Sequence, residues 1–165
     1  MLLPTFRFAA VILTALGLSL GVAHTLELPV KMKYDAELYT AVTRTLYRMY
    51  GIAGALFQMG ALLAVAVLCW LVRGRRGFRL SVAALLALIV SLGLWTALVQ
   101  PVNAEWARVL QSDPSAAPAS YLRLRARWEY GHVAACLAWL VGFACLVMSL
   151  LIEIPVRAGS SGTAE

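Results

Sequence analysis

The residues best suited to chemistry lie in two short pairs near opposite ends of the chain. His24 precedes Glu27 by three positions, and Glu129 precedes His132 by three. Residues three apart share one face of a helix, so each pair presents an imidazole and a carboxylate together. Both groups ligate metals and move protons. These are the two histidines of the chain, and we expect its function where the pairs meet.

Both pairs border long apolar runs, which decide the fold class. Of the 165 residues, 62% are hydrophobic and 13% are charged, far from the usual soluble balance. Four runs carry this excess: 8–23, 52–72, 80–99 and 133–152. The last three are long enough to cross a bilayer core, and the first is if residues 2–28 are helical. The sequence therefore predicts an all-α integral membrane protein, an up-and-down four-helix bundle.

The expected domain covers residues 1–154, and the polar, small-residue segment 155–165 is predicted to be a disordered tail. Within the domain, helices are expected at about 4–28, 35–73, 79–111 and 120–154. Pro29 is predicted to end the first helix, and Asp35 and Ser120 are candidate N-caps. Because the last three helices exceed the length a bilayer needs, we expect them to project into water on the outer side.

The loop 73–79 decides the predicted orientation, because it contains four arginines within seven residues. Short, arginine-rich loops remain in the cytoplasm. Both termini then lie in the cytoplasm of a multi-pass protein of the inner (plasma) membrane. The net charge of +6 comes mainly from residues that flank the apolar runs, so we expect the bilayer as a partner and no nucleic acid.

A seam of small residues runs along the first helix. Ala10, Thr14, Gly17, Gly21 and His24 follow one another at intervals of four and three. The two glycines form the GxxxG spacing that lets membrane helices approach closely. This seam predicts that the first helix packs into the bundle with His24 on its inner face.

The bundle geometry predicts how the two pairs meet. In an up-and-down bundle the first and fourth helices are antiparallel neighbours. His24 and His132 then face each other on one level, and Glu27 and Glu129 face each other about 4.5 Å higher, three residues of helical rise. We expect these four side chains to bind a transition metal (Fe, Cu, Mn or Zn) and to leave one position open.

Other polar residues fall in or near the same layer. Tyr47 is expected to act there in catalysis with Glu27 and Glu129. The glutamates would be ligands or proton acceptors, and Tyr47 would orient substrate or a bound water. Asn103, Trp128 and Arg48 are expected to contact substrate. Alternatives remain open: a bis-histidine b-type haem, a polar substrate pocket without metal, or a structural network that only satisfies its own members.

Several short motifs resemble the anthrone oxygenase-like family of small four-helix membrane proteins. They are the Pro-Val-Asn of 101–103, the Asp-Pro of 113–114, Tyr121, the Arg-Trp-Glu-Tyr-Gly-His-Val of 127–133, the segment 23–31 and the Leu-Tyr of 46–47. Two positions depart from the family pattern, Gly131 in place of Asn and Ala134 in place of Arg. The resemblance implies the fold, the membrane location and roles for Asn103, Trp128 and His132. For some relatives it implies oxidation of a flat polycyclic phenol.

Together these features predict a membrane oxidoreductase or oxygenase that acts on a small lipophilic or aromatic molecule. The alternative is a non-catalytic accessory or structural protein whose polar layer only fixes helix packing. A homo-oligomer or a membrane partner protein fits either hypothesis.

Overall fold

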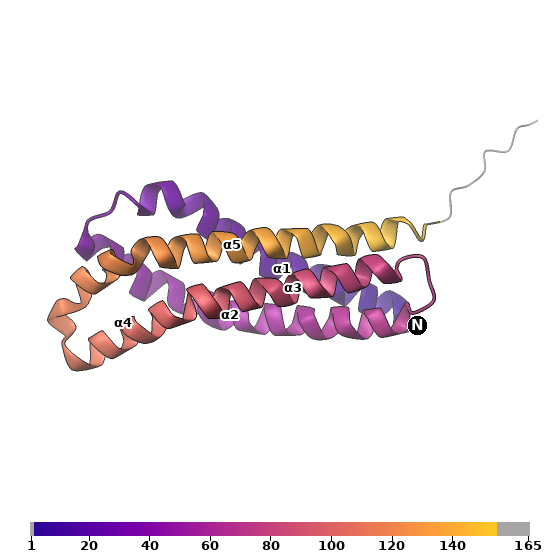
Figure 1. The fold of residues 1–165 in the computed structure, drawn as a ribbon, viewed down its shortest axis with the longest axis horizontal. Coiled ribbons are helices and arrows are strands. Elements are labelled where there is room, and N and C mark those ends of the chain that lie inside the picture. Colours follow the sequence, from indigo (N-terminus) through magenta and orange to yellow (C-terminus); the bar gives the residue numbers. More distant parts are fainter. Residues whose placement is uncertain (1, 155–165) are drawn as a thin grey trace, which may run out of the picture.

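The computed structural model describes residues 2–154, and the regular structure in this part of the chain is helical. The predicted disorder of 155–165 falls outside the described residues. Five α-helices and one short 3-10 helix follow in order: α1 Leu2–Lys31, α2 Ala36–Leu71, α3 Phe78–Leu98, α4 Gln100–Ser112, η1 Pro114–Ala116 and α5 Ala117–Leu151. Because α3 and α4 follow each other along one direction, the helices form four long rods (Figure 1).

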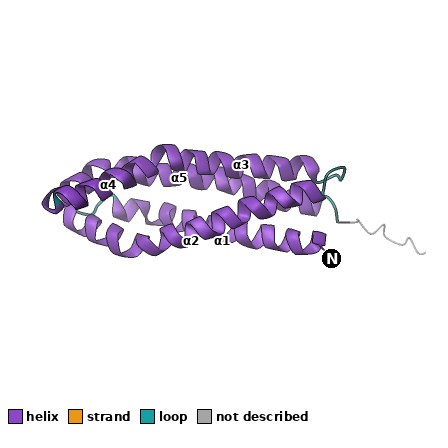
Figure 2. Cartoon of the chain, turned by 90° about the horizontal axis from the view of Figure 1, so that it is seen from below, coloured by secondary structure: helices purple, strands orange, loops and turns teal. Residues whose placement is uncertain are grey.

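The rods run up and down. The N-terminal end of α1, the loop 72–77 and the end of α5 lie at one end of the bundle, and the other connections lie at the opposite end (Figures 1 and 2). α1 packs against α2 and α5, and α3 packs against α5 and α2. The predicted neighbourhood of the first and last helices is confirmed.

Four stretches of the described residues are long and apolar enough to cross a membrane: Leu2–Lys31, Ala36–Leu71, Phe78–Ser112 and Pro114–Leu151. They correspond to the four predicted helices, and a multi-pass membrane bundle accounts for their apolar outer surfaces.

Helix α1 continues through Pro29 to Lys31, so the predicted end at residue 28 is wrong. Proline removes only its own N–H from the helix, and a loss so near the C-terminus is tolerated. Arg125 of α5 then caps this end, because its Nη1 donates to the carbonyl oxygens of Lys31 at 3.3 Å and Tyr34 at 2.8 Å. The extra turn places Lys31 on the face of α1 that carries His24.

One of the two predicted caps is confirmed. The Asp35 carboxylate accepts from the Leu38 N–H at 2.8 Å and begins α2. Ser120 lies inside α5, which begins at Ala117 after η1. Asp113 caps η1 instead, and hydrogen bonds from Ser115 lower the pKa of the Asp113 carboxyl.

The rod formed by α3 and α4 is interrupted at Val99. Pro101 has no N–H to offer the carbonyl of Ala97, one turn earlier. Arg127 of α5 replaces this bond, since its guanidinium donates to Ala97 O at 3.1 Å and to Leu98 O at 3.2 Å. The segment that opens the last helix therefore also stabilises the break in the third rod.

The small-residue seam of α1 is confirmed by burial and by close approach. Ala10, Thr14, Gly17 and His24 are buried. A Cβ on Gly17 would lie 2.9 Å from the Trp139 ring, closer than real Cβ contacts, and one on Gly21 would lie 3.1 Å from Cys136. Only glycine lets α1 and α5 come this close, as the GxxxG spacing predicts.

Candidate functional site

The two histidines meet between α1 and α5. Their rings are stacked with centroids 4.2 Å apart and an interplanar angle of 24°. His132 Nδ1 lies 2.9 Å from the carbonyl oxygen of Trp128, one turn earlier on α5. A carbonyl only accepts, so His132 Nδ1 carries the proton and Nε2 keeps the free lone pair. The prediction that His24 and His132 face each other between the first and last helices is confirmed.

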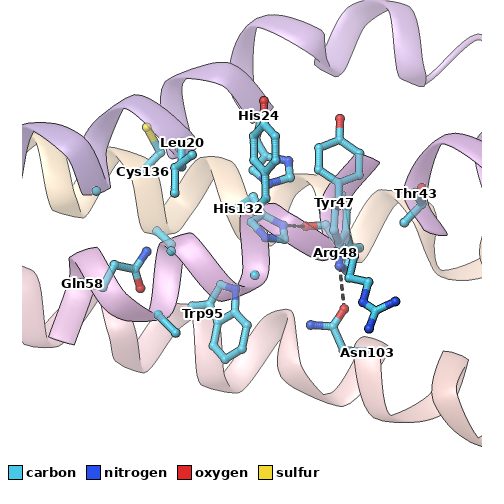
Figure 3. Close-up of a pocket in the computed structure, with 18 of the residues that line it drawn as sticks. Leu20, His24, Thr43, Tyr47, Arg48, Gln58, Trp95, Asn103, His132 and Cys136 are labelled. Carbon is cyan, nitrogen blue, oxygen red and sulfur yellow. Dashed lines mark hydrogen bonds between the residues drawn. The ribbon is translucent and has the colours of Figure 1, made fainter. Parts of the chain in front are cut away.

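Aromatic side chains extend this stack into a wall. Tyr47 stacks on the other side of His24 at 4.6 Å and 22°. Trp128 meets His24 edge-on at 5.2 Å and tilts against His132 at 4.2 Å. Farther out, Trp106 stacks on Tyr121 at 4.1 Å and 6°. Asn103 on α4 accepts from Trp128 Nε1 at 2.8 Å and so fixes that indole (Figure 3).

The two predicted glutamates are joined by a residue that the sequence argument missed. Lys31 Nζ lies 2.8 Å from Glu129 Oε2 and 3.6 Å from Glu27 Oε2. Lys31 and Glu129 keep only 2% and 1% of their side chains exposed. The hydroxyl of Tyr39 donates to Glu129 at 3.0 Å, and that of Tyr47 donates to Glu27. The predicted upper layer is thus an ion-paired cluster in which one lysine lies between two carboxylates.

Lys31 also connects this cluster to the histidine stack. Its Nζ lies 3.5 Å from His24 Nδ1 and 4.6 Å from the centroid of the Tyr47 ring. An ammonium group only donates, so His24 Nδ1 accepts and His24 Nε2 carries the proton. The signal in the sequence was the spacing, because Lys31 stands four residues after Glu27 and seven after His24.

The predicted metal ligands are close together but not arranged as a ligand set. Imidazole lone pairs lie in the ring plane, so stacked rings cannot point two of them at one ion without rotating. Glu27 and Glu129 are directed at Lys31 and the tyrosines. Among the described residues, no group of three or more His, Cys, Asp or Glu is placed to hold a metal ion. Metal binding stays a prediction that needs a rotated imidazole and a carboxylate released from Lys31.

A cavity of about 510 Å³ opens beside the aromatic wall, between α1, α2 and the rod of α3 and α4. Its surface is mainly apolar, and four glycines of α1 and α2 line it: Gly17, Gly21, Gly51 and Gly54. A Cβ on Gly51 would meet nothing within 4 Å. His24, Tyr47, Trp128 and His132 contribute to its wall, as Figure 3 shows for the labelled members.

The cavity also contains the remaining predicted substrate residues. Asn103 and Arg48 line it, and Arg48 reaches from α2 towards Asn103 (Figure 3). Arg44 and Gln58 line it as well. Few polar groups in an otherwise apolar pocket are typical of binding sites for small organic molecules.

A second cavity of about 370 Å³ lies on the other side of the ion-paired cluster. Glu27 and Lys31 line it together with apolar residues of α1 and α2. Tyr47 lines both cavities. Tyr47 therefore lies at the boundary between the two.

Comparisons of the chain with known protein families, with curated proteins and with solved structures find no match. The geometry of the cavity and its wall is therefore the guide to function.

Proposed function

We propose that this protein binds a small, flat, lipophilic molecule in the larger cavity and transfers a proton to or from it at the histidine pair. The observation that carries the proposal is the cavity itself, about 510 Å³ of mainly apolar space with an aromatic wall. This volume is within the range of pockets that enclose small organic ligands.

The wall favours an aromatic ligand. Stacked and edge-on rings offer flat faces, and aromatic pairs add about 0.5–1.5 kcal/mol each beyond the area they bury. Tyr47, Trp128 and Trp106 present such faces along the cavity. The resemblance to anthrone oxygenase-like proteins supports the same ligand class, because some of those relatives oxidise flat polycyclic phenols.

The two imidazoles are complementary in their hydrogen-bonding roles. His132 Nε2 is an acceptor and His24 Nε2 is a donor, because their Nδ1 atoms are fixed by the Trp128 carbonyl and Lys31. A phenolic O–H can give its proton to His132 Nε2 and leave as a phenolate. His24 Nε2–H can donate to the same oxygen once its ring rotates out of the stack. This proton transfer is the step that we assign to the pair.

Loss of space in the cavity tests the binding proposal. Gly51→Leu places a side chain in the cavity. Gly93→Leu is the matched control: a Cβ at either glycine meets nothing within 4 Å, but Gly93 does not line the cavity. We expect the purified protein in lipid nanodiscs to sensitise the fluorescence of 9-anthracenemethanol through its tryptophans. Gly51→Leu should weaken this binding at least about tenfold, or about 1.4 kcal/mol. Equal binding by both variants would overturn the proposal in favour of a structural or accessory protein.

The predicted metal-dependent oxidoreductase or oxygenase is a narrower form of this proposal. Metal analysis of the purified protein tests the ligand set, and His24→Ala and His132→Ala should each abolish retention of Fe, Cu, Mn or Zn. A b-type haem would instead give a Soret band that either change removes. Oxygen uptake with anthrone as substrate tests the oxidation that the resemblance predicts. Anthrone bound without oxygen uptake would restrict the function to binding and proton transfer.

The predicted orientation completes the proposal. The arginine-rich loop at 73–79 supports a cytoplasmic location for that end of the bundle, so the cavity lies in the outer half and the last three rods project beyond the bilayer. Cysteine in place of Ser115 should react with an impermeant thiol reagent in intact cells, and cysteine in place of Gly74 should not. The reverse pattern would invert the orientation and leave the cavity proposal intact.

A further inference from the structure

We propose that the ligand of the larger cavity carries one anionic group, which Arg44 and Arg48 bind at the mouth of the cavity. This inference rests on the proposed function and adds the charge of the ligand to it. The ligand would then be an amphiphile, with a flat apolar body against the aromatic wall and a carboxylate or phosphate group at the arginines.

The position of the two arginines supports an anion site. They stand four residues apart on α2 and therefore share one face with Tyr47 and Gly51. Both line the cavity. Arg48 extends towards Asn103, whose oxygen is taken by Trp128 Nε1 and whose NH₂ group remains a donor (Figure 3). Donors from α2 and α4 thus line the same cavity.

The charge around these arginines is not balanced by the protein. Within residues 2–154, ion pairs with carboxylates are made by other basic side chains: Arg7, Lys31, Arg75, Arg108 and Arg123. None of the described residues that line the larger cavity is Asp or Glu. In a cavity with low-dielectric walls, two uncompensated guanidinium groups attract an anion.

The ion-paired cluster of Lys31, Glu27 and Glu129 differs from the pair Arg44 and Arg48 in its balance of charge. There Lys31 lies 2.8 Å from Glu129 and 3.6 Å from Glu27, so a buried positive charge has carboxylate partners. Among the described residues, the larger cavity offers Arg44 and Arg48 no such partner. Guanidinium groups bind carboxylates and phosphates through paired N–H donors, which fits one terminal anionic group.

The test compares two probes of one shape, anthracene-9-carboxylate and the neutral 9-anthracenemethanol, in phosphatidylcholine nanodiscs. We expect wild-type protein to prefer the carboxylate. Arg44→Gln combined with Arg48→Gln should reduce the ratio of carboxylate affinity to neutral-probe affinity at least tenfold. Arg108→Gln combined with Arg123→Gln is the control, since it removes the same charge from exposed positions paired with Glu105. Unchanged preference in the Arg44 and Arg48 double variant would overturn the inference.

Failure of the inference is distinguishable from failure of the proposed function. If the neutral probe is lost in Gly51→Leu and the carboxylate preference survives the double arginine change, the cavity binds ligand and the anion site is wrong. If Gly51→Leu changes neither probe, the cavity itself is wrong.

A second arm identifies the source of the anionic group. Replacing part of the phosphatidylcholine by phosphatidylglycerol introduces a lipid phosphate. An anionic lipid is supported as ligand if phosphatidylglycerol displaces the carboxylate probe from the wild-type protein. It should not displace the probe that remains bound to the double arginine variant. Retention of the probe supports a smaller amphiphile held by the same two arginines.

Discussion

Towards the loop 72–77 the bundle has a tightly packed apolar core with polar contacts at its very end around Glu153. Towards the loops 32–35 and 113–116 it holds buried ion pairs, stacked rings and two cavities. At the closed end Leu68, Leu88 and Leu146 have no exposed surface. At the open end the buried residues include Lys31 and Glu129. One chain thus combines a packed anchor with an internally polar half.

The glycines of this bundle serve two opposite purposes, close packing and the opening of space. A Cβ on Gly142 would lie 2.8 Å from Leu88 Cδ2, so this glycine lets α5 and α3 touch. A Cβ on Gly51 would meet nothing. Small residues on membrane helices therefore indicate close packing at one level and a cavity at another, and only the partner helix decides which.

The largest expected effect comes from breaking the ion pair at the open end. Lys31→Met leaves Glu129 charged and buried without its cation, and removing one partner of a buried pair costs about 3–5 kcal/mol. We expect this loss in the free energy of unfolding, measured in detergent by denaturant titration. Lys31→Met combined with Glu129→Gln should cost less than Lys31→Met alone, because no unpaired charge remains on residue 129. A wild-type melting curve for Lys31→Met would show that the open end does not depend on this pair.

Lys31 also marks where prediction from the sequence succeeded and where it failed. The apolar runs predict the four rods, and the three-residue spacings predict that His24 meets His132. The sequence does not predict a buried Lys31, because Pro29 indicates the end of the first helix before it. One more turn, capped from α5 by Arg125, moves Lys31 into the interior. Such a cap between distant residues has no local signal in the sequence.

The cavity could not be predicted for a related reason. Spacing places Gly51 and Tyr47 on an inner face of α2, but it does not give the distance to α3 and α4. That distance depends on the break at Val99, where Gly131 lets α5 approach and Arg127 binds the carbonyls that Pro101 leaves free. A Cβ on Gly131 would lie 2.8 Å from Val99.

The second prediction tests the packing of the closed end. Gly142→Leu would drive a side chain into Leu88 and the Ala84 carbonyl, 2.8 Å and 3.1 Å from its Cβ. Overpacking of this kind costs up to about 3 kcal/mol. We expect the thermal midpoint in detergent to fall markedly, whereas Gly51→Leu should leave it nearly unchanged. Equal midpoints for the two variants would contradict the assignment of a packed end and an open end.

The third prediction concerns the polar contact that fastens the closed end. Glu153 pairs with Arg7 of α1 and accepts from the Gly77 N–H at 3.2 Å. It connects three rods, yet Arg7 keeps 27% of its side chain exposed. Glu153→Gln should therefore cost about 1–2 kcal/mol, less than the loss of Lys31. Added salt should lower the free energy of unfolding of the wild-type protein towards that of Glu153→Gln. Identical stability of the two proteins in low salt would show that Glu153 contributes nothing at the closed end.

The smallest expected effect is at the start of α2, where Asp35 caps the helix from the open end. Asp35→Ala removes the acceptor of the Leu38 N–H, and an N-cap of this type contributes about 1 kcal/mol. Asp35→Ser is the control, because a serine hydroxyl also caps. Since the closed end is packed independently, we expect faster hydrogen exchange of the first amides of α2 and unchanged exchange around Leu68 and Leu88. Faster hydrogen exchange at both ends in Asp35→Ala would mean that the bundle opens as one unit. The two halves would then differ in packing but not in local stability.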